Sequence, residues 1–305
     1  MEIPIVIIHF GNQEYFQECV RINSLHNKVY LIGDMSNKYC ENDKIQHINY
    51  EILIDDEIRN FKKKFTNYSS NAYIFELNCY LRIFYLQKVM KLYNIDYVFH
   101  LDSDCIVFEN IYNILSLSIP NIINSKTIAY SKNHSNNPYH MVGCVHNALL
   151  NMEFCNKFIE LCFDIYVNKS KYNLIESKIN WHKSNKIAGG ICDMTLYYLL
   201  YSENIISNVY DLNTINNNTN NTTNTSNTSN PETNVKCTFD HNINNSYGYL
   251  GDDTYIMLNN LKKLSIINHK PYVFDKTGNI IRLLSIHFSG GAKQILKLFY
   301  KHLME

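Results

Sequence analysis

The chain has 305 residues, of which 46% are hydrophobic, so it is long enough to bury a large core. Its 28 basic and 28 acidic residues balance, which excludes a general attraction to nucleic acid or to an anionic membrane. The nine cysteines are scattered and form no C-x-x-C pair, which favours reduced thiols over disulfides or a zinc cluster and predicts a cytoplasmic location.

The first third of the chain predicts alternating strands and helices. Strands are expected over residues 3–9, 28–33 and 96–101, and helices over about 12–24 and 72–93. Residues 3–9 (IPIVIIH) are continuously apolar and rich in β-branched side chains, as in a strand buried on both faces. Long connections between successive strands favour an α/β fold with a mostly parallel central sheet covered by helices. No apolar run approaches the roughly 18 residues that a membrane-spanning helix needs.

The rest of the chain predicts further helices, short strands and one low-complexity segment. Helices are expected over residues 151–167, 192–203 and from Ala292 onward, and strands near 236–240, 272–274 and 280–286. Residues 213–234 consist largely of Asn and Thr, which cannot bury a core, so we expect a disordered loop there. Because apolar segments resume on both sides of this loop, we expect a single domain over residues 1–305.

Two carboxylates follow the third predicted strand. Asp102 and Asp104 flank Ser103 on extended backbone, so both side chains point to the same side. Two such charges repel each other unless a cation lies beside them, and Mn²⁺ or Mg²⁺ suits oxygen ligands and also binds diphosphates. The alternative is a solvated turn, where Asp is common. In parallel sheets, ligands bind beyond the carboxyl ends of the strands, which is where this pair lies.

The stretch HFSGGAKQ, residues 287–294, is the second candidate. His287 ends an apolar strand, Gly290 forms a turn, and Lys293 opens a helix, whose free N–H groups favour an anion. His287 offers a nitrogen ligand for a transition metal. The alternative is a glycine turn beside a core histidine.

Two isolated charges complete the set of candidates. Asp193 follows a glycine pair at the start of a predicted helix, where it either caps the helix or accepts hydrogen bonds from a hydroxylated ligand. Arg82 lies on an apolar helix, where it either reaches the surface or pairs with a carboxylate or phosphate. Lys62, Lys63 and Lys64 are interpreted as a solvated helix face.

Together these motifs resemble the GT-A (Rossmann-like) glycosyltransferases, most closely the retaining branch that contains glycogenin and the bacterial α-galactosyltransferases. In that family the D-x-D motif holds Mn²⁺ on the donor diphosphate, and a downstream H-x-x-G-x-x-K supplies a third metal ligand and diphosphate contacts. The resemblance covers most of the chain outside the Asn/Thr loop. It implies that Asp102, Asp104 and His287 bind Mn²⁺ or Mg²⁺.

The resemblance also implies roles for the remaining candidates. Donor-binding residues would be Arg82, Asp102, Ser103, Gly290 and Lys293, and Asp193 would be catalytic. Residues 1–108 would form the nucleotide-sugar-binding half and residues 109–305 the acceptor-side half. The chain departs from the family pattern at Met194, where Gln is usual, and after Lys293, where Pro-Trp is common.

The implied activity is transfer of a sugar from a nucleotide diphosphate, a UDP-sugar, to a hydroxyl on a glycan, protein or small molecule, with retention of configuration. One alternative is a sugar-1-phosphate nucleotidyltransferase. That class usually carries a glycine-rich basic loop near its N-terminus, which the segment HFGNQEY does not resemble. The other alternative is a non-catalytic carbohydrate- or protein-binding module on a decayed transferase fold.

Overall fold

The computed structural model of the protein describes residues 2–119, 127–132, 135–213, 236–244, 255–296 and 299. Apart from Asn213, the low-complexity segment predicted over residues 213–234 lies outside these described residues, as does most of the helix predicted after Ala292.

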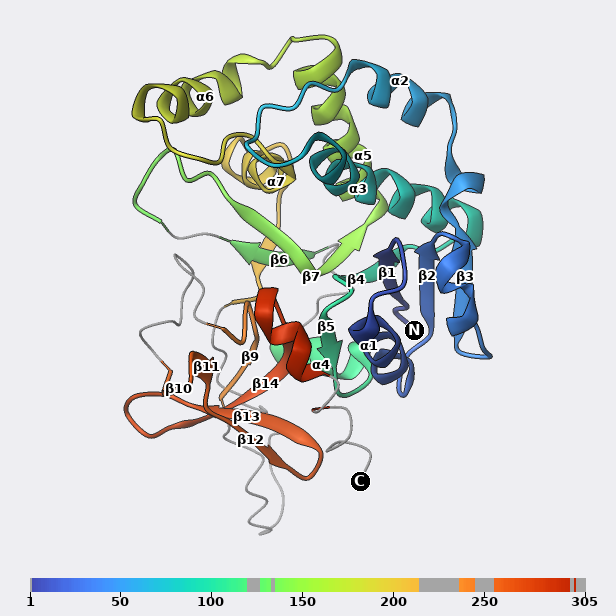
Figure 1. Cartoon of the computed structure of the whole chain (residues 1–305), viewed down its shortest axis with the longest axis vertical. Coiled ribbons are helices and arrows are strands. Elements are labelled where there is room, and N and C mark those ends of the chain that lie inside the picture. The colour runs from blue at the N-terminus through green and yellow to red at the C-terminus, as the bar shows by residue number, and fades with distance from the viewer. Residues whose placement is uncertain are drawn as a thin grey trace.

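A seven-stranded sheet runs through the middle of the molecule in the order β3-β2-β1-β4-β7-β6-β8 (Figure 1). Its strands are β1 (Ile5–His9), β2 (Val29–Gly33), β3 (Ile45–Asn49), β4 (Tyr97–Leu101), β6 (Ile128–Lys132), β7 (Gly143–Asn151) and β8 (Val209–Asp211). Four of its pairings are parallel, and β7 pairs antiparallel with both β4 and β6. The mostly parallel α/β sheet expected from the sequence is therefore confirmed.

Helices cover both faces of this sheet. They are α1 (Glu14–Ser24), α2 (Asp56–Lys64), α3 (Tyr73–Tyr93), α4 (Ile111–Ser118), α5 (Met152–Cys162), α6 (Asn173–Asn185) and α7 (Asp193–Ser202), with short helical turns at Met35–Cys40, Tyr50–Leu53, Phe163–Val167 and Gly290–Ala292. Figure 1 shows α2, α3, α5, α6 and α7 on one side, and α1 and α4 with a second sheet on the other.

The alternating side chains of β1 show why this strand is apolar throughout. Val6 and Ile8 belong to the hydrophobic core beneath α3 and α5, whereas Ile5 and Ile7 belong to the core on the opposite face. Successive residues of a strand point to opposite faces, so a sheet covered on both sides needs apolar residues at every position. The expectation for residues 3–9 is therefore confirmed.

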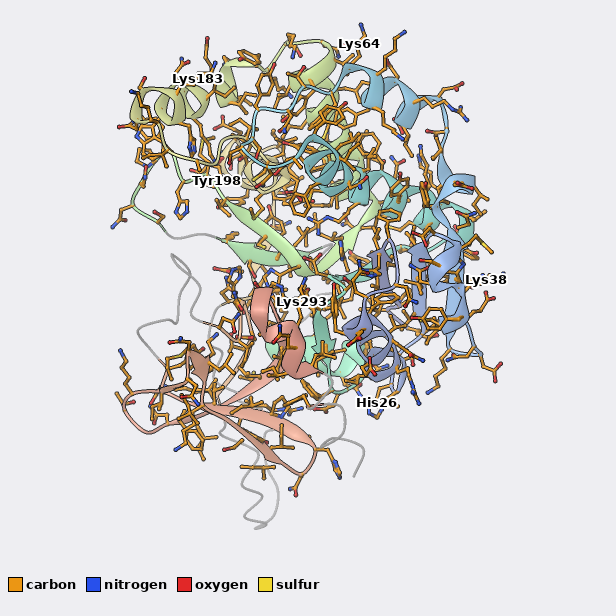
Figure 2. All side chains as sticks on the ribbon, viewed as in Figure 1. His26, Lys38, Lys64, Lys183, Tyr198 and Lys293 are labelled. Atoms are coloured by element: carbon orange, nitrogen blue, oxygen red, sulfur yellow. The ribbon has the colours of Figure 1, made fainter. Side chains whose placement is uncertain are left out.

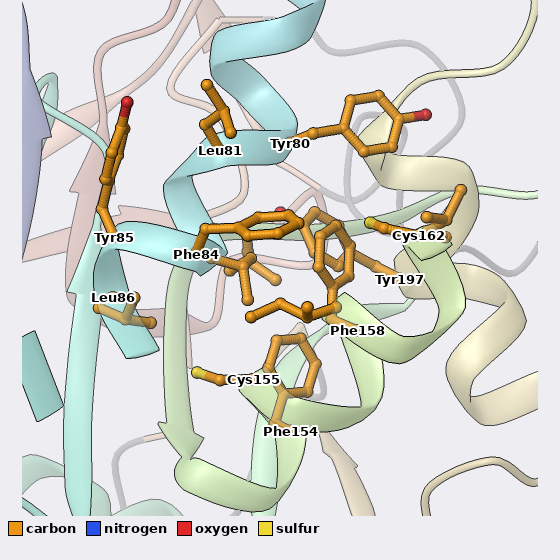
Figure 3. Packing of buried hydrophobic residues seen from close by; sticks show 14 of the residues in the cluster. Tyr80, Leu81, Phe84, Tyr85, Leu86, Phe154, Cys155, Phe158, Cys162 and Tyr197 are labelled. Atoms are coloured by element: carbon orange, nitrogen blue, oxygen red, sulfur yellow. The ribbon is translucent and has the colours of Figure 1, made fainter. Parts of the chain in front are cut away.

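The larger core includes many Phe and Tyr side chains, several of which lie between α3, α5 and α7 (Figure 3). Phe158 of α5 and Tyr197 of α7 stack with ring centroids 4.9 Å apart. Buried tyrosines need partners for their hydroxyl groups, and Tyr80 and Tyr166 supply one another with an O···O distance of 2.6 Å. This packing fixes the two helices that carry Arg82 and Asp193.

The second sheet contains strands from distant parts of the chain, in the order β12-β13-β14-β5, with β9 also paired to β14. Its strands are β5 (Cys105–Val107), β9 (Lys236–Phe239), β12 (Leu264–Ile267), β13 (Lys270–Phe274) and β14 (Ile280–His287), and a small hairpin pairs β10 (Met257–Leu258) with β11 (Leu261–Lys262). The β5–β14 ladder places His287 opposite Cys105. His287 is thereby brought next to the D-x-D motif.

Most elements expected from the sequence are present, within a few residues at their ends. The elements not foreseen are α2, α4, α6 and the strands β3, β5 to β8 and β10 to β12. Lys62, Lys63 and Lys64 are exposed on α2, as expected of a solvated face. Within the described parts of the chain, no helix combines the length and apolar character required to cross a lipid bilayer.

Candidate functional site

The two carboxylates of the D-x-D motif leave β4 at its carboxyl end, between β1 and β7. The Asp102 N–H donates to the His146 carbonyl of β7 at 2.8 Å, and the Cys105 N–H then donates to the Asp102 carbonyl at 2.9 Å. This turn ends the strand, and both carboxylates line the same cavity, as expected of side chains on one side, but they contact different partners. Asp102 faces the helices, whereas Asp104 faces the second sheet.

Arg82 joins Asp102 to Asp193. Its Nη1 donates to Asp102 Oδ1 and its Nη2 to Asp193 Oδ2, both at 2.6 Å. Burial alone would raise the pKa of Asp102, but the Arg82 guanidinium outweighs burial and holds the pKa well below its usual value. Of the alternatives for Arg82, the structure therefore shows a paired arginine.

Asp193 is the first residue of α7, and its position depends on the preceding glycines. Gly190 has φ +122°, and a Cβ at this position would lie 2.1 Å from the Tyr68 carbonyl oxygen. The chain can pass Tyr68 at this distance only with glycine. The Asp193 side chain also accepts from the Met194 N–H at 2.9 Å, so it combines a helix-terminal contact with the Arg82 pair.

Asp104 meets two residues of the HFSGGAKQ stretch. His287 Nε2 lies 3.4 Å from Asp104 Oδ1, and Lys293 Nζ lies 3.0 Å from Asp104 Oδ2. The Phe288 N–H also donates to the Asp104 carbonyl at 2.9 Å. Figure 2 shows Lys293 between the two sheets, whereas Lys38, Lys64 and Lys183 lie at the edge of the molecule. Gly290, with φ +57°, begins the turn Gly290–Ala292 that leads to Lys293.

Asp104 and His287 shift each other's pKa. Burial lowers the pKa of His287, but the Asp104 carboxylate outweighs it, so the pKa is raised overall. Burial raises the pKa of Asp104, and His287 reverses this, so that pKa is lowered. His287 Nδ1 lies 2.6 Å from the His241 carbonyl, which can only accept. Nδ1 therefore carries the proton, and Nε2 faces Asp104.

The donor set fits a divalent cation in part. Ligand atoms of Asp104, Cys105 and His287 lie within 4.8 Å of one another. Carboxylate oxygen with imidazole nitrogen suits Mn²⁺. Asp102 does not belong to this close group in the described residues, because its Oδ1 faces Arg82. Asp104 and His287 are thus the residues that could hold a cation together, with Asp102 beside them.

A cavity of about 560 Å³ lies above the D-x-D turn. The candidates that line it are Arg82, Asp102, Ser103, Asp104, Asp193 and Lys293. His287 and Gly290 do not line it, but His287 lies directly behind two lining residues, Asp104 and His146. Ser103 Oγ lies 2.9 Å from His9 Nδ1, which ties the turn to the end of β1.

Several residues that line this cavity were not predicted from the sequence, and one of them, Glu76, is a buried carboxyl group. Glu76 is 1% exposed, and accepts from Asn71 Nδ2 at 2.6 Å and from Ser69 Oγ at 3.2 Å. Burial raises its pKa. Glu76, Cys79 and Arg82 recur every three residues, so they share one helix face, and this spacing could have revealed them.

No protein-family model matches the sequence, and no curated protein matches it. Among solved structures, mouse xyloside xylosyltransferase 1 in its apo form is similar in fold, with a TM-score of 0.44 and 13% identity over 70% of this chain and 86% of that chain. The bifunctional glycosyltransferase WbbM gives a TM-score of 0.38 and 13% identity over 69% of this chain and 38% of its own. A glycosyltransferase involved in glycosylation of the major capsid of PBCV-1 gives 0.35 and 13% over 69% and 81%. Similarity at this level concerns the fold and says nothing about the substrate.

Proposed function

We propose that the protein is a metal-dependent glycosyltransferase that moves a sugar from a nucleotide diphosphate, a UDP-sugar, to a hydroxyl acceptor with retention. The observation that carries this proposal is the meeting of Asp104 with His287 and Lys293 at a cavity also lined by Arg82 and Asp193. Carboxylates and a lysine that line the cavity, with an imidazole directly behind Asp104, suit a diphosphate with its counter-cation. The volume, about 560 Å³, falls within the range of ligand pockets.

In the proposed reaction, the bond between the sugar C1 and the diphosphate oxygen breaks, and its electron pair stays on the diphosphate. The acceptor hydroxyl oxygen forms the new bond to C1 and gives up its proton. Mn²⁺, or Mg²⁺, held by Asp104 and His287 beside Asp102, would supply positive charge to the leaving diphosphate. Lys293 lies at the cavity with a raised pKa, since Asp104 outweighs burial, so it is charged and can donate to phosphate oxygens.

Arg82 and Asp193 have a different role in the proposal. Asp193 is 3% exposed, and Arg82 holds one of its oxygens in place. A fixed carboxylate in a cavity can accept hydrogen bonds from sugar hydroxyls and so position the donor or the acceptor. Ser103 and Gly290 would contact the donor through the turns that they form. We also propose a cytoplasmic location, which the nine free cysteines support.

The test is release of UDP from a panel of UDP-sugars with Mn²⁺ present. Removing a group that stabilises charge on the leaving group typically lowers the rate by about 10²- to 10³-fold. We therefore expect a loss of that size in the rate of UDP release by Asp104→Asn. Asp43→Asn, which changes an exposed aspartate outside the cavity, should keep full activity. Full activity in Asp104→Asn would rule out the proposed role of this carboxylate.

The same assay separates the alternatives. A nucleotidyltransferase would release pyrophosphate from UTP and a sugar phosphate instead of UDP. A binding module would show a thermal shift with a UDP-sugar and no turnover. A true donor should raise Tm only when the metal is present, because only then does the folded state bind it tightly.

A further inference from the structure

A second group of ligand atoms lies next to the candidate site. Cys144 and His146 are two residues apart on β7, so their side chains lie on the same face of the strand. His241 follows β9 and belongs to the second sheet's side of the molecule. One ligand atom from each of the three residues lies within 4.8 Å of the others. The group does not contain the C-x-x-C spacing, and its third member, His241, is remote in sequence from the other two.

The three side chains are packed closely against one another. Cys144 Sγ lies 2.9 Å from His146 Nδ1. The rings of His146 and His241 meet edge to face, with centroids 4.6 Å apart. A thiol-to-imidazole hydrogen bond would account for the first contact, but it does not explain why a second imidazole lies at the same point.

His146 provides an independent sign of a missing ligand. The residue is 2% exposed, and its Nε2 makes no hydrogen bond of good geometry among the described residues, although the Asp240 backbone lies close to the ring. An unpaired buried polar atom costs about 1–3 kcal/mol, so its presence calls for an explanation. His146 also stacks on His287, with ring centroids 4.5 Å apart.

We propose that Cys144, His146 and His241 bind a thiophilic divalent transition metal, Zn²⁺ in the reduced protein. One thiolate with two imidazoles is a donor set typical of Zn²⁺, and it differs from the oxygen-rich set that Mn²⁺ prefers. Three protein ligands leave a fourth position open, as in catalytic rather than purely structural zinc sites. Because Cys144 and His146 line the cavity, the fourth ligand would come from there.

The binding step requires that Cys144 lose a proton. Burial, followed by Asp102, raises the pKa of the Cys144 thiol to about 12 in the metal-free protein. When Zn²⁺ binds, the S–H bond breaks, the sulfur keeps the electron pair as its bond to zinc, and the proton passes to solvent. Zinc affinity should therefore rise with pH. This site does not depend on the proposed transferase activity, so the two can fail separately.

The experiment uses the full chain, stripped with a chelator under reducing conditions and then dialysed against ZnSO₄ or CoCl₂. The wild type should retain about one zinc per chain by elemental mass spectrometry, and its Co²⁺ form should show a thiolate-to-metal charge-transfer band. Cys144→Ser should abolish the band, and both Cys144→Ser and His241→Gln should lower the zinc content at least about tenfold.

Three matched variants locate the site. Cys192→Ser changes another partly buried cysteine that lines the same cavity, and it should keep both the zinc and the band. Cys105→Ala and Asp104→Asn alter the neighbouring ligand group, and they should keep both as well. Thermal melts monitored by circular dichroism would check that each variant folds.

The proposal is overturned if the wild type retains no zinc, if the band persists in Cys144→Ser, or if Cys105→Ala removes it. If Cys144→Ser does not fold, the wild-type band together with the zinc content of His241→Gln decides the question. Zinc retained in full by a folded His241→Gln would also overturn the three-residue site.

Discussion

The protein contains two buried ion networks, one beside each sheet, and they differ in whether their charged side chains line the cavity. On the side of the seven-stranded sheet, Arg82 bridges Asp102 and Asp193, and all three residues line the cavity. Next to the second sheet, Lys262 of the β10–β11 hairpin pairs with Asp240, which follows β9, at 2.5 Å, and neither lines the cavity. The first network can therefore meet a ligand directly.

The second network acts on backbone position. Asp240 Oδ2 accepts from the His287 N–H at 3.2 Å, and the Asp240 carbonyl accepts from Asn147 Nδ2 at 3.1 Å. Lys262 Nζ also donates to the Asn242 carbonyl at 2.8 Å. These bonds tie β14 to β7 and to the segment that carries His241. Asp102 and Asp193 are therefore held by an arginine that lines the cavity. His287, in contrast, is held by a hydrogen bond to Asp240, which lies outside the cavity.

Removing the arginine should have the largest effect on stability. Arg82→Met leaves two carboxylates unpaired, and the Asp193 side chain is only 4% exposed. Breaking a buried ion pair in this way costs about 3–5 kcal/mol, and we expect a loss near the upper end from urea denaturation. Arg59→Met removes an exposed pair with Asp56 and should cost less than about 1 kcal/mol. Equal losses in the two variants would contradict the arrangement.

Breaking the second network should cost somewhat less, because one carboxylate is stranded instead of two. Lys262→Met leaves Asp240, whose side chain is fully buried, without its ammonium partner. We expect a loss of about 3 kcal/mol in the free energy of unfolding. The neighbouring Lys263 is exposed over the Phe274 ring, and Lys263→Met should cost about 1 kcal/mol at most. A loss for Lys262→Met no larger than this control would show that Asp240 is held by other contacts.

A smaller effect is expected at the helix cap that follows β7. The Asn151 side chain accepts from the Phe154 N–H at 2.9 Å and so caps α5. Asn151→Ala should lower the free energy of unfolding by about 1 kcal/mol. Asn60→Ala, at an exposed interior position of α2, should cause no loss because alanine favours the helix. If both variants are neutral, the cap does not contribute.

Acid should weaken the turn between β13 and β14, because that turn depends on an ionised carboxylate. Asp275, in the turn between β13 and β14, accepts from Asn279 and Thr277, and these bonds lower its pKa to about 2. A carboxyl whose folded pKa is depressed stabilises the fold above its ordinary pKa and loses that contribution as pH falls through the folded value. Hydrogen-exchange protection of β13 and β14 should therefore fall between about pH 4 and pH 2.

Asp275→Asn provides the matched control for the acid effect. The amide oxygen can still accept from the backbone N–H groups of the turn, but the side chain no longer titrates. The variant should show weaker protection at neutral pH and little further loss of protection in acid. An acid response equal to that of the wild type would assign the effect to other groups.

The sequence predicted the elements with long apolar patterns in both regions and missed many of the short ones, for a physical reason. The continuous apolar run of residues 3–9 and the long breaker-free stretch that became α3 are local patterns, since the 2-residue and 3.6-residue periods are set by neighbouring positions. The short strands β5, β8 and β10 offer only two or three residues each, too few to show a period, and none of them was predicted.

What the sequence by itself determined is the α/β fold with a mostly parallel sheet, and the location of Asp102 and Asp104 at the end of a strand. That His287 belongs near them was suggested only by resemblance to a family. The tertiary structure decided which charges meet: β14 pairs with β5 so that His287 lies opposite Cys105, and α3 and α7 pack so that Arg82 reaches both Asp102 and Asp193. Such contacts depend on strand register and helix packing between distant segments, which no local pattern of residues specifies.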